Sequence, residues 1–198
     1  MTHHDDRFTR TLNAFDQANL ADPRTDIDEQ GVAHPSEWLY GRRMSTELAH
    51  FCPQASEALQ LAARAQHLER WMIPRDNFAR DRAGYLAWRN ALKQRQAQRA
   101  SELMAAEGYD ETLQQRVASL IRKERLKQDV ESQTLEDVAC LVFLRYGFTQ
   151  FAQAHDKEKI LDIVRKTWRK MSDAGHQAAL ALPLPATDLA LVSEALAG

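Results

Sequence analysis

The stretch Leu135–Tyr146, which reads LEDVACLVFLRY, constrains the fold of this chain more than any other. As a helix it would be apolar on every side, except for two acidic residues, Glu136 and Asp137, at its start. A helix of this kind belongs in the middle of a domain, and acidic side chains placed there need polar partners. The stretch therefore predicts the central helix of an all-helical domain, with a polar site at its N-terminal end.

The rest of the composition agrees with an all-α fold. With only 7 glycines and 6 prolines in 198 residues, the chain has little punctuation for many short strands. Its length predicts one domain, and its net charge of −2 gives no overall attraction to nucleic acid or to a membrane. We therefore expect a single-domain helical bundle, and we expect neither nucleic acid nor a membrane as its partner.

Two further features bear on the location of the protein. No apolar run approaches the roughly 18 residues that a spanning helix needs, and the polar residues 3–6 are not followed by the apolar run of a secretory signal. Cys52 and Cys140 lie in apolar contexts without metal-ligand spacing, which favours free buried thiols in a reducing compartment. We expect the protein to be cytoplasmic.

Hydrophobic spacing predicts helices along the whole chain. They cover residues 6–19, 36–50, 54–72 and 86–107, a helix capped by Asp110, the central helix, a basic amphipathic helix over 155–172 and a short tail helix over 187–197. Residues 22–34 are expected to be a loop. In terms of domains, residues 1–37 form an acidic N-terminal helix and loop, 38–176 the helical core, and 177–198 a tail.

Glu136 and Asp137 are the first candidates for chemistry. Carboxylates at the start of a buried helix can hold a metal or orient a base. Thr134, however, lies three residues before Asp137, which fits a capping box in which the acid bonds back to the first turn. Capping is the favoured interpretation of Asp137, and a role in a site is the alternative.

His67 is the second candidate, because it lies on an alanine-rich helix expected to be mostly buried. A single histidine there is usually a hydrogen-bonded core residue. Polar neighbours such as Glu69 and Arg70 make a ligand or base equally plausible, since polar clusters inside a helical core need a reason.

Basic residues form a third group. Arg75 and Arg89 alternate with the aromatic residues Tyr85 and Trp88, a combination that suits a phosphate group and a stacked ring. A solvated charged face is the alternative. Phosphate-binding glycine loops, nucleophile elbows and zinc motifs are absent from the sequence.

The last basic helix carries further candidates for ligand binding. They are His155 and Asp156 at its start, Lys166 within it and His176 just after it. Asp156 also fits a first-turn acid that stabilises the helix N-terminus.

Two stretches resemble the HD-domain phosphohydrolases. They are ALQLAARAQHLE, residues 58–69, and residues 98–144, which include GYDETLQQRVASLI and QTLEDVACLVFL. The resemblance covers roughly residues 38–146 and implies an HD-like helical core, in which His67 takes the place of the family's paired histidine and Asp137 that of its final aspartate. Leu68 stands where the family has aspartate, and histidines are absent near Tyr40 and Arg95. The resemblance therefore implies neither a bound metal nor another cofactor.

The chain is also similar to the family called domain of unknown function 4202, over about residues 8–180. The similarity lies in AARAQHLERWMIPR, GYLAWR, QTLEDVACLVFL and HDKEKILDIVRKTWRKMSDAGHQAAL. It implies that the family's characteristic positions are His67, Arg70, Trp71, Pro74, Arg75, Tyr85, Arg89, Glu136, Asp137, His155, Asp156, Lys166, Trp168 and His176. It implies no activity.

The first functional hypothesis is a pocket for a phosphorylated or nucleotide-like small molecule, between the helix of His67 and the helix that starts at Glu136. His67 would act as base or ligand with Asp137 orienting it, while arginines meet the anion. A metal-independent or weak phosphohydrolase reaction is its catalytic form. The second hypothesis is a non-catalytic protein-interaction module that uses the basic final helix. The sequence leaves open whether the protein is an enzyme, and it does not define the oligomeric state.

Overall fold

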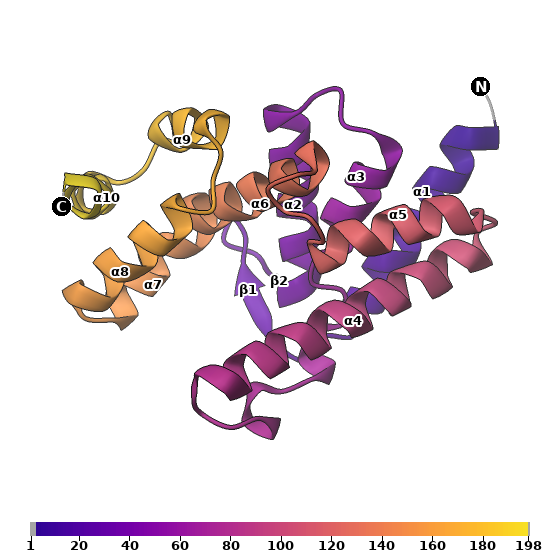
Figure 1. Ribbon diagram of the computed structural model, residues 1–198, viewed down its shortest axis with the longest axis horizontal. Helices are drawn as coiled ribbons and strands as arrows, with labels where there is room; N and C mark the ends of the chain where they lie inside the picture. The colour runs from indigo at the N-terminus through magenta and orange to yellow at the C-terminus, as the bar shows by residue number, and fades with distance from the viewer. Residues whose placement is uncertain (1–2, 198) are drawn as a thin grey trace. The chain divides into compact units, whose positions relative to one another are not determined.

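The computed structural model describes residues 3–197 and is almost entirely helical (Figure 1). In chain order its elements are α1 (His3–Asn19), β1 (Thr25–Ile27), β2 (Ala33–Pro35), α2 (Ser36–Phe51), α3 (Glu57–Arg64), α4 (Arg82–Ala106), α5 (Glu111–Arg122), α6 (Val130–Val142), α7 (Phe148–Ala154), α8 (Lys157–Trp168), α9 (Asp173–Leu180) and α10 (Ala186–Ala197). The expected all-α class is confirmed. Within the described residues, no helix is both long enough and apolar enough to cross a membrane.

The chain divides into two compact units, each described here by itself. The first unit runs up to Ala49 and continues over Pro53–Glu124, while the second consists of His50–Cys52 and the chain from Arg125 onward. The transition at residue 124 falls inside the region 38–176 that the sequence predicts as one HD-like core. That core remains a prediction.

The core of the first unit forms where α3, α4 and α5 pack together (Figure 1). Small side chains on α3, such as Ala62 and Ala63, are fully buried, which lets neighbouring helices come close. Gly41 of α2 shows how close, because a Cβ atom there would lie 2.9 Å from the backbone oxygen of Arg64.

The helix expected over 54–72 is wrong in its second half. Ser56 caps α3 by accepting a hydrogen bond from the Leu59 amide, but the helix ends at Arg64. Turns follow, and then a short 3₁₀ segment over Arg70–Met72. Glu69 adopts a left-handed backbone, with φ 50° and ψ 37°, so an α-helix could not have continued through it to Met72.

The segment expected as a loop over 22–34 contains a small hairpin. Strands β1 and β2 pair antiparallel, with Asp26 opposite His34. The Asp28 carboxylate accepts hydrogen bonds from the Gln30 and Val32 amides, which closes the turn. Strands of three residues are too short to give a readable alternating pattern, so the sequence did not predict them.

In the second unit, the predicted central helix is confirmed as buried but begins earlier than expected. Helix α6 starts at Val130 and continues through a π-helical turn, Phe143–Gly147, into α7. Leu135, Val138 and Leu141 are fully buried, as the apolar pattern predicts.

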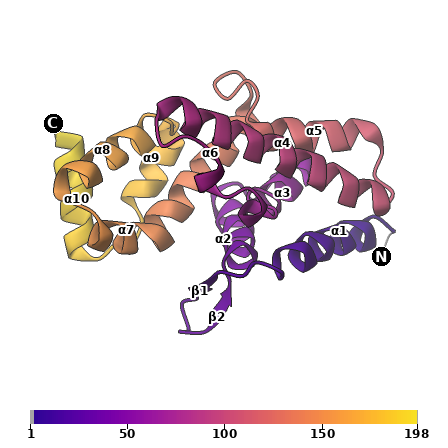
Figure 2. The ribbon, with the colours of Figure 1, turned by 90° about the horizontal axis from the view of Figure 1, so that it is seen from below.

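The C-terminal part of this unit is more ordered than a tail. The expected helix at 187–197 exists as α10, and it packs against α8 (Figure 2). Val192 and Ala195 are buried in the same core as Ile160 and Val164 of α8. Helix α9, with its short run of small residues, was not predicted.

Candidate functional site

The centre of the candidate site is a pair formed by His67 and Glu37. The Nδ1 atom of His67 lies 3.1 Å from Oε2 of Glu37, which stands in the first turn of α2. One turn further along α2, Tyr40 stacks on the imidazole, with ring centroids 4.0 Å apart and planes 11° from parallel. The His67 side chain is 19% exposed and that of Glu37 only 7%, so this pair is largely removed from water.

Further charged side chains surround Glu37. Its other carboxylate oxygen accepts a hydrogen bond of 2.8 Å from Arg24. Arg24 also donates to Asp22, and the buried Asp22 carboxylate accepts from the Glu37 backbone amide at 3.1 Å. Burial raises the pKa of Glu37, but the charges and hydrogen bonds of His67, Arg70 and Arg24 outweigh burial and lower it below its ordinary value. Glu37 is therefore an ionised carboxylate at neutral pH.

Arg70 lies beside the ring of His67. Its NH1 atom is 3.2 Å from Nε2 and 3.4 Å from Nδ1 of the imidazole. A nitrogen in the plane of the ring could not come so near to both without colliding with Cε1 between them, so the guanidinium lies off the ring plane. Burial lowers the pKa of His67 to about 4; Glu37 opposes this change, and Arg70 and Arg89 add to it.

These contacts define the protonation of His67 at neutral pH. The ring is uncharged, so one of its nitrogens carries hydrogen and the other is an acceptor. Because the Glu37 carboxylate can only accept, the hydrogen lies on Nδ1. Nε2 is left with a lone pair, which is the arrangement of a base oriented by a carboxylate.

The arginines and aromatic residues expected to accompany His67 lie in the same unit. Trp88 of α4 donates to the Ile73 carbonyl at 2.9 Å, and the Arg70 guanidinium lies 5.2 Å from the centre of its ring. Arg75 instead holds a turn, donating to the carbonyls of Phe78 and Ala79. Tyr85, 5.9 Å from Trp88 between ring centroids, is about half exposed.

Asp137 has its partners within the second unit. Ser172 donates to it twice, from Oγ at 2.6 Å and from the backbone amide at 2.8 Å, and Gln133 donates at 3.1 Å. A Cβ atom at Gly175 would lie only 2.6 Å from the same carboxylate. Asp137 therefore joins α6 to the start of α9.

The capping interpretation of Asp137 is wrong. The residue that caps α6 is Asp129, which accepts from the Glu131 and Ser132 amides. Thr134 is already inside the helix and donates to the Val130 carbonyl. The sequence placed the start of the helix too late, so it assigned the cap to the wrong residue.

Glu136 is buried, with the Lys170 ammonium 3.8 Å away. Near this end of α6 lies a groove of about 440 Å³, whose lining includes Phe51, Cys52, Val130 and Asp137. All of these residues belong to the second unit.

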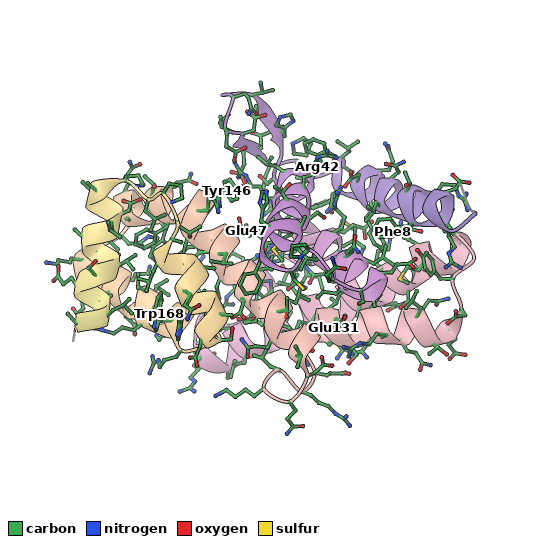
Figure 3. All side chains as sticks on the ribbon, turned by 90° about the horizontal axis from the view of Figure 1, so that it is seen from above. Phe8, Arg42, Glu47, Glu131, Tyr146 and Trp168 are labelled. Atoms are coloured by element: carbon green, nitrogen blue, oxygen red, sulfur yellow. The ribbon has the colours of Figure 1, made fainter. Side chains whose placement is uncertain are left out.

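The other candidates in the second unit have structural partners. His155 bonds the Phe151 carbonyl and stacks on the Phe151 ring, and Asp156 caps α8 by accepting from the Lys159 amide. His176 bonds the carbonyl of Trp168, which is labelled in Figure 3, and stacks on its ring with centroids 4.2 Å apart.

Lys166 pairs with Asp162, one turn earlier on α8. The predicted ligand-binding roles of His155, Asp156, Lys166 and His176 remain predictions.

The structure brings His67, Arg70, Trp88 and Arg89 together in the first unit, and Glu136 with Asp137 in the second. The pocket expected between His67 and Asp137 remains a prediction.

The sequence missed Glu37, although a signal existed. Glu37 lies on the same helical face as Gly41, Met44 and Leu48, all buried, so its spacing marks a buried acid.

Comparison with known proteins gives one match. A family model described as a domain of unknown function (DUF4202) matches residues 9–192. Neither the curated proteins nor the solved structures contain a match to the chain. Among the described residues, no group of three or more His, Cys, Asp or Glu side chains is arranged to hold a metal ion.

Proposed function

Because the chain belongs to the DUF4202 family, whose description gives no activity, we propose a function from its own side chains: it binds a phosphorylated or nucleotide-like small molecule at the His67 cluster. We define this cluster as His67, Glu37, Arg70, Trp88 and Arg89. It combines four residues that the sequence singles out with Glu37, which the structure adds, and all five lie within the first compact unit.

Unpaired positive charge is the observation that carries the proposal. Among the described residues, neither Arg70 nor Arg89 has a carboxylate within ion-pair distance, whereas Arg24 is paired with Asp22 and Glu37. Burial lowers the pKa of Arg70; the charge of Glu37 opposes this change, and the nearby charge of Arg89 adds to it. Two neighbouring guanidinium groups that are partly removed from water, and that make no ion pair with a carboxylate among the described residues, favour an anion, and phosphate suits their geometry.

The ring of a nucleotide-like ligand has a candidate partner in Tyr85. This side chain is about half exposed and lies beside Trp88, whose own ring is next to Arg70 and Arg75. An exposed aromatic face next to arginines suits a stacked base above a bound phosphate.

His67 supplies the catalytic form of the proposal. Its Nε2 lone pair can accept a proton from a hydroxyl group or a water molecule, and Glu37 stabilises the charged ring that results. Glu37 therefore takes the orienting role that the sequence analysis gave to Asp137. A metal-independent phosphoester hydrolysis would use this pair.

Calorimetric titration with pyrophosphate and with AMP tests the binding site. Removing one cation of the cluster, Arg89→Gln, should weaken binding by about 10-fold or more, as expected for a charge-assisted hydrogen bond worth roughly 1.5–3 kcal/mol. Arg80→Gln is the matched control, because Arg80 is a neighbouring arginine whose side chain is 85% exposed and paired with Asp76. Equal losses in both variants, or no loss at Arg89, would refute the proposed site.

The alternative, an interaction module on the basic final helix, has less support. Lys157 pairs with Glu194, Lys166 with Asp162, and Arg165 donates to the Ala195 carbonyl. These cations therefore already have partners within the second unit. Suppose that Lys166→Ala and Arg169→Ala abolished the binding of an acidic partner, while His67→Ala left the affinity for pyrophosphate unchanged. The alternative would then replace the proposal.

A further inference from the structure

Glu69 has an unusual backbone at a sensitive point of the chain. It is not glycine, yet its φ of 50° lies in the left-handed region, which side chains with a Cβ atom rarely adopt. It stands between His67 and Arg70, the two residues that contact each other in the His67 cluster. Such a conformation persists only when its surroundings hold it there, and it is often found at functional sites.

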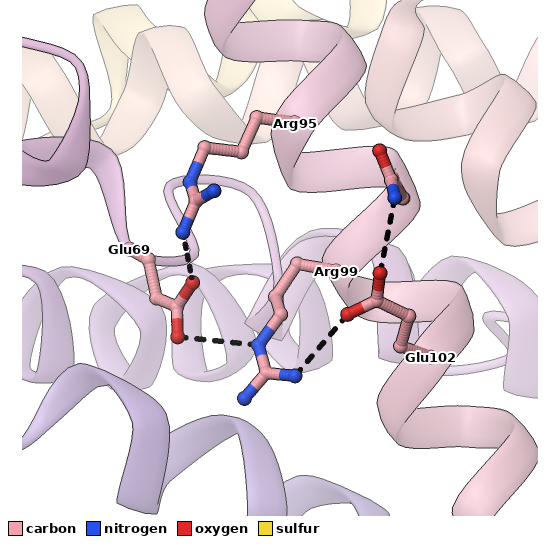
Figure 4. Close-up of a pocket in the computed structure, with 5 residues that line it drawn as sticks. Glu69, Arg95, Arg99 and Glu102 are labelled. Carbon is pink, nitrogen blue, oxygen red and sulfur yellow. Dashed lines mark hydrogen bonds and ion pairs between the residues drawn. The ribbon is translucent and has the colours of Figure 1, made fainter.

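Three side chains hold Glu69 in this conformation. Its backbone amide donates to Oδ1 of Asn19 at 2.9 Å. Its carboxylate meets two arginines of α4, with Arg95 on one oxygen at 3.0 Å and Arg99 on the other at 3.2 Å (Figure 4). The main chain and the side chain of Glu69 are thus fixed from different directions.

We call the Glu69 carboxylate and its two partners, Arg95 and Arg99, the carboxylate clamp. It borders a pocket and is not part of the apolar core. The pocket has a volume of about 340 Å³, and its lining is entirely polar: Glu69, Arg95, Gln98, Arg99 and Glu102. Both arginine side chains are more than one third exposed, at 38% for Arg95 and 35% for Arg99. Water-exposed ion pairs contribute little to global stability, so stability alone does not explain why two arginines converge on this residue.

The backbone connects the clamp to the His67 cluster. The His67 carbonyl accepts from the Arg70 amide at 3.0 Å, and the Glu69 carbonyl accepts from the Met72 amide at 3.0 Å. Glu69 therefore lies inside the hydrogen-bonded turn that joins His67 to Arg70.

We propose that Glu69 is the positioning residue of the His67 cluster: its carboxylate, held by Arg95 and Arg99, fixes the turn that places His67 against Glu37 with Arg70 beside the ring. The ligand that this arrangement serves rests on the proposed function, but the positioning itself does not. Glu69 contacts no reacting group and acts through His67 and Arg70.

The test is the titration of the His67 ring nitrogens by ¹⁵N NMR in the full chain. His67 faces Glu37 and Tyr40 from α2, Arg70 from its own turn and Arg89 from α4. The Glu69→Gln variant keeps the size of the side chain but loses its charge, so the turn should relax and the ring should become hydrated. Because burial is the main cause of the low pKa of His67, that pKa should rise from about 4 towards 6.5, by roughly one unit or more.

Glu102→Gln is the matched control. Glu102 pairs with Arg99 in the same pocket, but it belongs to α4 and is not on the turn. Its variant should leave the His67 titration unchanged. If Glu69→Gln lowers the melting temperature without moving the titration, or if Glu102→Gln moves it equally, Glu69 is not a positioning residue.

Two further measurements keep the test decisive. Arg95→Gln removes one arm of the clamp and leaves Arg99, so it should shift the titration in the same direction by less, even if Glu69→Gln does not fold. The NMR measurement needs no ligand. A shifted titration in a protein that does not bind pyrophosphate would therefore refute the proposed function and support the positioning role, and the reverse result would refute only the latter.

Discussion

Among single residues, His67 gives the clearest dependence of stability on pH. Its pKa is about 6.5 in an unfolded chain and about 4 in the folded protein, so between these values the unfolded state binds more protons. The part of the free energy of unfolding that depends on neutral His67 is therefore fully present above pH 6.5 and is lost as the pH falls towards 4. The lowered pKa of Glu37 acts in a different window, below its ordinary value of 4.5.

We predict that the free energy of unfolding attributable to His67 falls by about 2 kcal/mol between pH 7 and pH 5. Urea unfolding of the wild type and of His67→Gln at both pH values measures it as a difference. Gln cannot titrate, so the variant should lose less stability on acidification. Parallel losses in the two proteins would show that His67 is not the group that titrates.

The sequence singles out His67 and Arg70 as candidates, because polar side chains stand out in an alanine-rich stretch, and their roles in a site remain predictions. Their partners could not be predicted in the same way. Glu37 lies 30 residues from His67, and Ser172 lies 35 residues from Asp137. Contacts at such separations depend on how helices pack, which the local pattern of one helix does not contain.

At the scale of elements, helix starts show most clearly how sequence and structure differ. The sequence favours a cap at Thr134 for the central helix, whereas the structure places the cap at Asp129. Both are ordinary capping residues, and only the packing of the preceding turn selects between them.

This difference predicts a larger loss of stability for one substitution than for another. Asp129→Ala removes the acceptor for two helix amides and should cost about 1 kcal/mol of unfolding free energy. Thr134→Ala removes only a bond from a side chain to a carbonyl inside the helix and should cost less than about 0.5 kcal/mol. Chemical denaturation ranks the two, and a larger loss at Thr134 would support the capping box expected from the sequence.

The end of α3 at Arg64 is the other feature that the sequence did not predict. Its apolar spacing continues past Arg64, and Leu68 is fully buried, so the pattern looks helical to Met72. Asn19, Arg95 and Arg99 bind Glu69 in a left-handed conformation, which excludes a helix that continues to Met72. Tertiary contacts here override a helical pattern.

At the scale of the molecule, the all-α class follows from the few glycines and prolines and from the long apolar stretch, which spans α6 and the π-helical turn after it. The division into two compact units does not follow. The connection between them at residue 124 carries neither proline nor glycine, and the charged run over residues 122–129 reads equally well as a loop inside one domain. Which helices share a core depends on long-range contacts, as between α8 and α10.

Because the chain has two compact units, the location of a bound ligand can be tested by comparing amide protection in one unit with that in the other. Saturation with a ligand at 100 times its dissociation constant stabilises the binding-competent state by about 2.7 kcal/mol. If pyrophosphate binds at the His67 cluster, amides over residues 65–90 that exchange by local opening should exchange more slowly. Locally opening amides of α8 should not change, because the cluster belongs to the first unit.

Hydrogen exchange followed by mass spectrometry, with and without pyrophosphate, measures this pattern. Arg89→Gln should lose the protection over residues 65–90, while Arg80→Gln should keep it. Protection confined to α8 would instead assign the anion to the basic helix, where cations such as Lys166 now pair with acids of their own unit. The location of the protected segment therefore decides between the two functional hypotheses that the sequence left open.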